Sequence, residues 1–109
     1  MFKFKHFEIH DELSAMKIGT DGVLLGAWAD VRDARSILDV GTGTGLVAIM
    51  CAQRNATASV HGIDIVEAAA REAEQNMART AWHERLSAEC ADLRSYNPDV
   101  RYDHIVSNP

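Results

Sequence analysis

The heptapeptide DVGTGTG, residues 39–45, constrains the fold of this chain more than any other feature of its sequence. It closes a short apolar run, Ser36 to Val40, and leads into an apolar helical pattern from Thr44 to Arg54. Glycine lets the backbone adopt positive φ and lets a ligand approach closely, because no Cβ stands in the way. A strand that turns through such a loop into a helix is typical of nucleotide-binding α/β folds. The loop therefore predicts a ligand site beside a sheet.

Strands and helices alternate along the rest of the chain. Beyond the strand at 36–40, the sequence predicts a strand at 58–63, a helix at 66–79, and strands at 86–91 and 102–106. Alternation with short connections indicates a parallel, doubly wound sheet, which is a Rossmann-like α/β fold. We expect the strand at 102–106 to lie beside the one at 36–40. Ligands of such sheets bind outside the carboxyl ends of the strands, where strand order reverses.

Three aspartates, Asp39, Asp64 and Asp92, lie at the ends of successive predicted strands. We expect all three at the ligand-binding edge, although each alone could be a turn or helix-cap residue. Together they would repel a pyrophosphate unless basic groups offset them. The dinucleotide fingerprint needs glycine where this chain has Leu46, and no lysine follows the loop to make a phosphate-binding motif. The carboxylates suit a cation with a ribose and no phosphate, such as S-adenosylmethionine.

The last predicted strand runs into Asn108 and Pro109, which we expect to be catalytic. Proline biases the residue before it toward extended backbone, which directs Asn108 across the edge of the sheet. An amide oxygen and a nearby backbone carbonyl can accept both N–H bonds of a planar amine. They thereby favour attack of its lone pair on a methyl group by alignment and electrostatics. Asn97-Pro98 follows polar residues and is interpreted as a plain turn.

Composition argues against several other classes of protein. A net charge of −5 disfavours binding of nucleic acid through bulk charge alone. No apolar run approaches the roughly 20 residues of a membrane span, and the N-terminus lacks the apolar core of a signal peptide. We therefore expect a cytoplasmic protein. The five histidines show no metal-ligand spacing, so no metal is expected, and Cys51 and Cys90 are expected to be buried free thiols.

These motifs resemble a known family. DVGTGTG resembles motif I of class I S-adenosylmethionine-dependent methyltransferases, and Asn108-Pro109 resembles the first half of the Asn-Pro-Pro-Tyr motif of amino-group methyltransferases. The run FKFKHFEIHDELSAMKIGTDGVLLGAWA, residues 2–29, is similar nearly position by position to bacterial tRNA adenine-N-methyltransferases that modify the adenine beside the anticodon of a valine tRNA. The resemblance continues through AWHERL and CADL and covers the whole chain.

The resemblance implies a class I methyltransferase fold, S-adenosyl-L-methionine as the cofactor and a tRNA as the substrate. Asn108 would orient the target amine. An N-terminal segment, residues 1–30, would close the cofactor pocket ahead of a core that starts at residue 36. The residues implied to bind the cofactor are Gly41 and Gly43 at its methionine part, Asp64 at its ribose, Ala91 and Asp92 at its adenine, and the signature residues Lys17, Thr20 and Asp21.

Two alternatives remain open. A protein-glutamine N-methyltransferase shares the logic of the Asn-Pro-Pro-Tyr motif, because the amide of glutamine is also planar, although the N-terminal run favours tRNA. A non-catalytic cofactor-binding fragment is the other alternative. The family continues beyond the position of Pro109 with a second proline, an aromatic residue and three more strands. We therefore expect these 109 residues to form the N-terminal part of a methyltransferase domain and to be inactive alone.

Overall fold

The structure is a computed structural model that describes residues 2–12, 22 and 29–108. The expectations for Lys17, Thr20, Asp21 and Pro109 therefore lie outside the described residues. The described elements, in chain order, are β1 (Phe2–Lys3), β2 (Glu8–Ile9), β3 (Ser36–Val40), α2 (Leu46–Arg54), β4 (Ser59–Asp64), α3 (Glu67–Ala78), the 3-10 turn η1 (His83–Arg85), β5 (Leu86–Cys90), the 3-10 turn η2 (Leu93–Ser95) and β6 (His104–Ser107).

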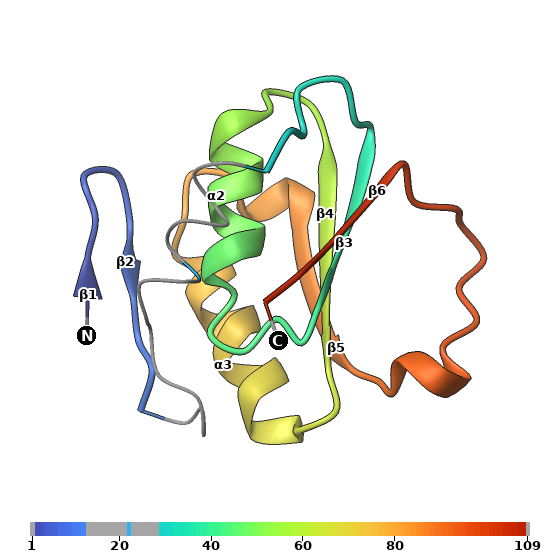
Figure 1. Cartoon of the computed structure of the whole chain (residues 1–109). Coiled ribbons are helices and arrows are strands. Elements are labelled where there is room, and N and C mark those ends of the chain that lie inside the picture. Colours follow the sequence, from blue (N-terminus) through green and yellow to red (C-terminus); the bar gives the residue numbers. More distant parts are fainter. Residues whose placement is uncertain (1, 13–21, 23–28, 109) are drawn as a thin grey trace.

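Strands β3 to β6 form one parallel sheet in the order β5-β4-β3-β6. The chain builds outward from β3 to β5 and then returns to place β6 on the other side of β3, with Leu38 opposite Ile105 (Figure 1). Strand order thus reverses between β3 and β6, and the carboxyl ends of all four strands meet at the lower edge in Figure 1. The predicted four-stranded, doubly wound parallel sheet is confirmed.

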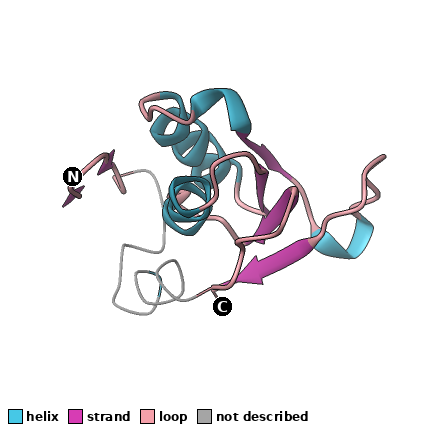
Figure 2. Cartoon of the chain, turned by 90° about the horizontal axis from the view of Figure 1, so that it is seen from above, coloured by secondary structure: helices cyan, strands magenta, loops and turns pink. Residues whose placement is uncertain are grey.

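Helices α2 and α3 cover one face of this sheet, and the connection from β5 to β6 runs over the other face (Figures 1 and 2). The apolar core lies between the helices and the sheet. Its fully buried members include Ile37 of β3, Ile49 of α2, Val60 of β4 and Ala73 of α3. Side chains alternate between the faces of a strand, so Leu38, next to Ile37, belongs to the opposite face.

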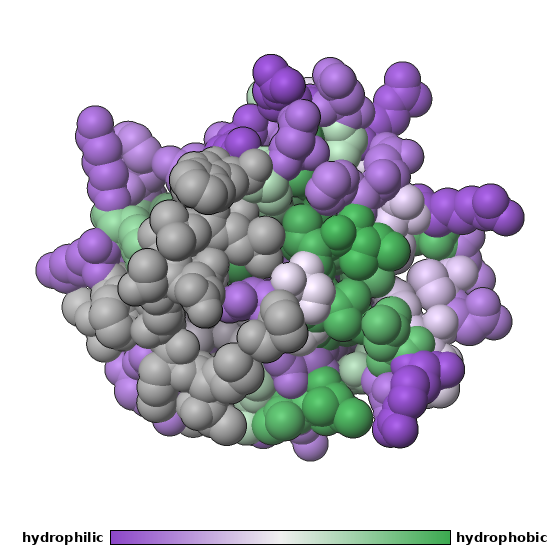
Figure 3. Space-filling model, viewed as in Figure 1, coloured by the Kyte–Doolittle hydropathy of each residue, from purple (hydrophilic) through white to green (hydrophobic). Residues whose placement is uncertain are grey.

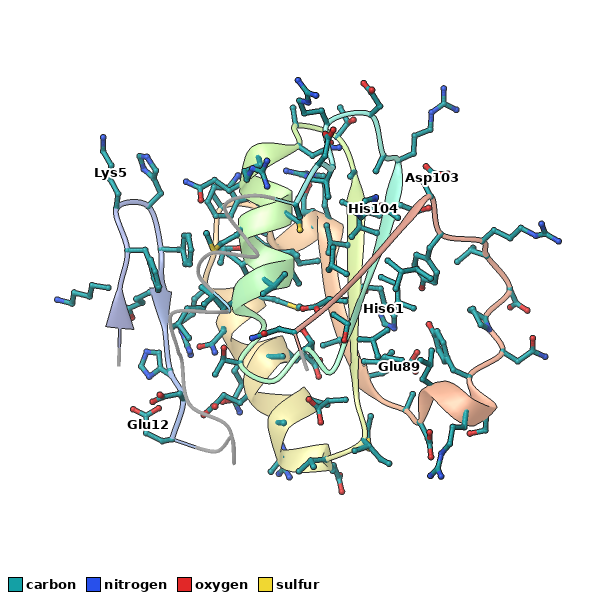
Figure 4. All side chains as sticks on the ribbon, in the orientation of Figure 1. Lys5, Glu12, His61, Glu89, Asp103 and His104 are labelled. Carbon is teal, nitrogen blue, oxygen red and sulfur yellow. The ribbon has the colours of Figure 1, made fainter. Side chains whose placement is uncertain are left out.

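A polar network fastens the β5–β6 connection to that opposite face. His61 of β4 contacts the Ser87 hydroxyl through Nδ1 at 2.6 Å and the Glu89 carboxylate through Nε2 at 2.9 Å (Figure 4). The ring of Tyr96 stacks on His61 at 6.4 Å, and its hydroxyl lies 3.1 Å from that of Tyr102. A cavity of about 660 Å³ remains between the sheet and the connection. These contacts determine where the chain re-enters the sheet.

The N-terminus forms a hairpin beside the helices. Strands β1 and β2 pair antiparallel, and the backbone amide of Phe4 donates to the carbonyl of Phe7 at 2.7 Å. The two phenyl rings stack at 4.9 Å, and Phe7 meets Trp82 edge to face at 6.0 Å. Ile9 is fully buried and joins the core. The chain bends at Lys5 and His6, between the two strands.

The predicted bounds of β3 are confirmed, and the bounds of the other sheet strands and of α2 and α3 shift by one or two residues at one or both ends. The fourth strand of the sheet begins at His104 rather than at 102, because polar contacts occupy the backbone just before it. The Asp103 carboxylate accepts from the backbone amides of Arg35 and Ser36 at 2.7 and 3.3 Å, and the Ser36 hydroxyl donates to the carbonyl of Arg101. No helix among the described residues is long and apolar enough to cross a membrane.

The two thiols differ in environment. Cys51 is buried and unpaired, as predicted, and burial raises the pKa of its thiol to about 11. The prediction of a buried thiol at residue 90 was wrong, since Cys90 is exposed. It closes β5, one of the two outer strands of the described sheet, at the carboxyl edge.

Candidate functional site

The glycine loop connects β3 to α2 at the point where strand order reverses. Gly41 and Gly43 adopt positive φ angles of 71° and 55°. Residues that have a Cβ rarely adopt this conformation. Within the described part of the chain, a Cβ added to Gly41 would meet no atom within 4 Å, so the described residues leave the outer side of the loop open. The loop is tied to β4, because the amides of Gly41 and Thr42 both donate to the carbonyl of Ile63 at 2.9 Å. The loop therefore exposes its backbone at the carboxyl edge of the sheet, while the hydrogen bonds to β4 fix the position of its first residues.

Asp64, the last residue of β4, lies next to this loop. Its carboxylate accepts from the amide of Gly43 through Oδ2 and from the amide of Val66 through Oδ1, both at 2.9 Å. The side chain is half-buried. Each carboxylate oxygen has two lone pairs, so each can accept one further hydrogen bond. Asp64 thus stabilises the glycine loop and also remains a hydrogen-bond acceptor at the open edge of the sheet.

Asp39 does not face the open edge, in contrast to the expectation of three carboxylates in one crevice. It precedes the last residue of β3, and alternation along the strand turns its side chain toward α2. It is 1% exposed and accepts from the Thr42 hydroxyl at 2.8 Å and from the backbone amide of Ala48. Burial raises the pKa of the Asp39 carboxyl to about 7, and the nearby charge of Asp64 acts in the same direction. Asp39 therefore stabilises the glycine loop from its buried side, through the hydrogen bond with Thr42.

Ala91 and Asp92 follow β5 at the same edge, since the Ala91 amide donates to the carbonyl of Asp64 at 3.0 Å. The Asp92 carboxylate is paired with Arg94, whose Nη2 lies 2.6 Å from Oδ2. Hydrogen bonds from the Arg94 side chain and backbone lower the pKa of Asp92. The sequence interpretation missed Arg94, although an arginine two residues after the aspartate was the available signal. The positive charge of Arg94 therefore offsets the negative charge of Asp92 at this edge of the sheet.

Exposed apolar side chains accompany the polar groups. Ile65 and Val66 follow β4, and Leu93 follows Asp92; their exposed fractions are 63%, 45% and 53%. Apolar surface beside a few convergent polar groups is typical of sites for organic ligands. The sequence interpretation did not single out Ile65 or Leu93, because exposure at a turn is not visible in a pattern of residue types.

Asn108 lies directly after β6. The register places Ser107 opposite Val40, and the Ser107 hydroxyl donates to the carbonyl of Val40 at 3.2 Å. Asn108 therefore follows β6 at the same level at which Gly41 follows β3, on the two sides of the strand-order reversal. The structure brings the glycine loop, Asp64, Ala91-Asp92 and Asn108 to one edge of the sheet.

A buried asparagine of α3, Asn76, joins the N-terminal hairpin to the glycine loop. Its Nδ2 donates to the carbonyls of His10 and Thr44, each at 2.8 Å, and its Oδ1 accepts from the amide of His10 at 2.9 Å. The sequence interpretation missed this residue. Its signal was a polar side chain three positions after Ala73, next to the apolar face of the predicted helix. Within residues 2–12, 22 and 29–108, no group of three or more His, Cys, Asp or Glu side chains could hold a metal ion.

The strand order and the glycine loop at its reversal point define a Rossmann-like fold of the class I methyltransferase type. Solved structures agree. Magnesium protoporphyrin IX methyltransferase from Synechocystis, with bound SAH, has a TM-score of 0.59 and 28% identity over 79% of this chain and 37% of its own. Protein arginine methyltransferase 10 from Arabidopsis thaliana has a TM-score of 0.60 and 25% identity over 68% of this chain and 21% of its own.

Family membership follows from the sequence match. The model of the methyltransferase small domain family matches residues 14–109, and the chain belongs to that family. The chain is 50% identical over 111 residues to a tRNA1(Val) (adenine(37)-N6)-methyltransferase of Bacteroides fragilis, and 46% identical over 108 residues to one of Vibrio campbellii. Both matches cover 99% of this chain but only 46% and 45% of the relatives, so the chain spans about half of their length.

Proposed function

We propose that this chain belongs to an S-adenosyl-L-methionine-dependent methyltransferase that modifies the exocyclic amino group of an adenine in tRNA. The observation that carries the proposal is the single edge that holds the glycine loop, Asp64 and Asn108, in a chain 50% identical to a relative named for that activity. A cofactor site and an amine-orienting amide on one edge are the two parts that transfer of a methyl group to nitrogen requires.

The edge fits the proposed cofactor. Gly41 and Gly43 leave the open side of the loop to its methionine part, and Asp64 retains lone pairs for the ribose hydroxyls. Ala91 and Asp92 lie where the adenine would bind, with the apolar side chains of Ile65 and Leu93 nearby in the chain. When bound, S-adenosylmethionine supplies an electrophilic methyl group. Asp39 would contribute by holding the loop rather than by contact.

The proposal extends to residues outside the described part of the chain. Lys17, Thr20 and Asp21 belong to the family signature, and we assign them to an N-terminal segment, residues 1–30, that closes the cofactor pocket ahead of the core. The hydrogen bonds of Asn76 to His10 and to Thr44 support this assignment, because they link residue 10 of the segment to the end of the glycine loop. Pro109 would restrict the backbone of Asn108.

Asn108 would act by orientation rather than as a base. The lone pair of an exocyclic amine is delocalised into the ring and is a poor nucleophile. The Asn108 oxygen and a backbone carbonyl that accept both N–H bonds favour a pyramidal nitrogen with its lone pair aimed at the methyl carbon. After attack, the nitrogen carries a positive charge and releases its proton readily. No strongly basic side chain is needed.

The proposal also specifies the class of substrate, which is an adenine in tRNA and not a glutamine in a protein. A glutamine amide could use the same asparagine, but the names of the relatives favour adenine. The net charge of −5 implies that recognition of tRNA depends on local groups and not on overall charge. We also propose that the protein works in the cytoplasm, where a bacterial tRNA substrate would be found.

The test measures methyl transfer by the unaltered chain and by a chimera. In the chimera, the part of the Bacteroides fragilis relative beyond the matched segment follows residue 109. We expect the chimera to transfer a labelled methyl group from S-adenosylmethionine to bacterial tRNA, with N6-methyladenosine as the product after digestion. Asn108→Ala should lower its kcat by two orders of magnitude or more, about 2.7 kcal/mol. Label found in protein glutamine and not in tRNA would overturn the substrate class.

A further inference from the structure

Gly22 lies against the side chain of Asn108. A Cβ built on Gly22 would stand 3.1 Å from Asn108 Nδ2 and 3.8 Å from Leu46 Cδ2. Gly22 is buried and helical, and its φ is outside the positive range that Gly41, Gly43 and Gly45 occupy. Its backbone conformation therefore does not require glycine. The requirement is steric, and the atom that imposes it belongs to Asn108.

The available space is smaller than a methyl group needs. Carbon makes favourable contact with other heavy atoms at about 3.5–4.0 Å. A side chain at residue 22 would thus push the Asn108 amide away by a few tenths of an ångström. An amide is planar, so contact on its nitrogen side determines where its oxygen points. Displacements of this size change the geometry of attack, to which transfer reactions are sensitive.

We propose that Gly22 is a positioning residue for Asn108: the missing Cβ lets the amide rest against residue 22 and leaves Oδ1 to the target amine. The inference rests on the proposed function. Leu46, the first residue of α2 after the glycine loop, contacts the same space. The N-terminal segment therefore acts on the orientation of the methyl acceptor, in addition to its proposed closure of the cofactor pocket.

The substitution Gly22→Ala in the chimera tests this. Alanine favours helix more than glycine does, so the variant has no backbone reason to lose stability. We expect kcat to fall at least tenfold while the Kd for S-adenosylhomocysteine stays within twofold. In the Asn108→Ala background, the same substitution should produce no further loss, because the group that it displaces is absent. An unchanged kcat, or an equal loss in both backgrounds, would overturn the proposal.

Two further measurements do not depend on methyl transfer. The side-chain amide resonances of Asn108 in the ¹H–¹⁵N spectrum of the 109-residue chain should shift in Gly22→Ala. The thermal midpoint should rise on Gly22→Ala when residue 108 is alanine and should not rise when it is asparagine, since only asparagine meets the added methyl group. Unshifted resonances, or an equal rise in both backgrounds, would contradict the contact. If the unaltered chimera methylates nothing, the proposed function fails, and these two measurements still decide the contact.

Discussion

The backbone amide of Gly43 donates to the carboxylate of Asp64 at 2.9 Å. The glycine loop is therefore bonded directly to the residue that we propose binds the ribose. The other oxygen of Asp64 accepts from the Val66 amide at the same distance. A change at this residue therefore acts on both the ligand contact and the shape of the loop.

For Asp64→Ala, we expect the affinity for S-adenosylhomocysteine to fall tenfold or more, which is about 1.4 kcal/mol. Titration calorimetry on the chimera measures this. Asp64→Asn should lose less, because its amide oxygen can still accept from Gly43. Asp99→Ala, at an exposed residue on the opposite face of the sheet, is the matched control and should bind as the unaltered chimera does. Equal affinities for Asp64→Ala and the control would contradict the ribose assignment.

We expect neither NAD nor ATP to stabilise the chain as much as S-adenosylhomocysteine does. Leu46 stands where the dinucleotide loop needs its third glycine, and no lysine follows Gly45 to bind phosphates. Thermal melts with each ligand at millimolar concentration measure the difference. A larger upward shift with either nucleotide than with S-adenosylhomocysteine would refute the proposed cofactor.

Asp39 should make the stability of the chain depend on pH. Its pKa in the folded chain is about 7, above the unperturbed value of 3.8. The folded state therefore holds the proton more tightly than the unfolded state. The resulting stabilisation is fully present below about pH 4 and is lost as pH rises through about 7.

Asn at position 39 can keep both hydrogen bonds without ionising. We expect Asp39→Asn to be more stable than the unaltered chain at pH 8, on the order of 2–4 kcal/mol, and the advantage to shrink toward pH 4. Urea denaturation at several pH values measures it. Asp33→Asn, at an exposed carboxylate, is the matched control variant. Parallel stability curves for Asp39→Asn and the unaltered chain would count against a buried, protonated Asp39.

Loss of the Asn76 side chain should release the N-terminal hairpin. Asn76→Ala removes the partners of the His10 amide and of the carbonyls of His10 and Thr44. We expect a loss of about 1–3 kcal/mol in the free energy of unfolding, because buried polar groups remain without partners. Hydrogen exchange at the His10 amide should accelerate more than exchange in the β3–β4 ladder. Unchanged exchange at His10 would show that other contacts hold the hairpin.

Strand β6 presents an apolar, exposed residue at the border of the described sheet. Ile105 is 60% exposed, apolar surface lies near this strand (Figure 3), and the described pairing of β6 is to β3 alone. Exposed edge strands promote association between chains, and an edge lysine opposes it. We expect Ile105→Lys to lower light scattering of the 109-residue chain more than Leu93→Lys, a control at an exposed apolar residue outside any strand. Equal effects would indicate that apolar exposure, and not the strand edge, causes association.

The sequence alone determined the four strands, their parallel order and the position of the glycine loop. These properties depend on local patterns: apolar runs bounded by turn residues, helical spacing between them, and glycines between Asp39 and Leu46. Short connections then leave little choice of topology. The same patterns placed Asp64, Asp92 and Asn108 after their strands, which is why the structure gathers them at one edge.

Only the tertiary structure decided what each polar side chain faces. Asp39 and Asp64 are similar in sequence, since each comes at the end of an apolar strand, yet one is buried under α2 and the other lies at the open edge. Asn76 contacts His10, 66 residues away, and Gly22 meets Asn108. Such contacts form when separate elements pack, and a local pattern of residue types carries no information about which distant atoms will share a given space.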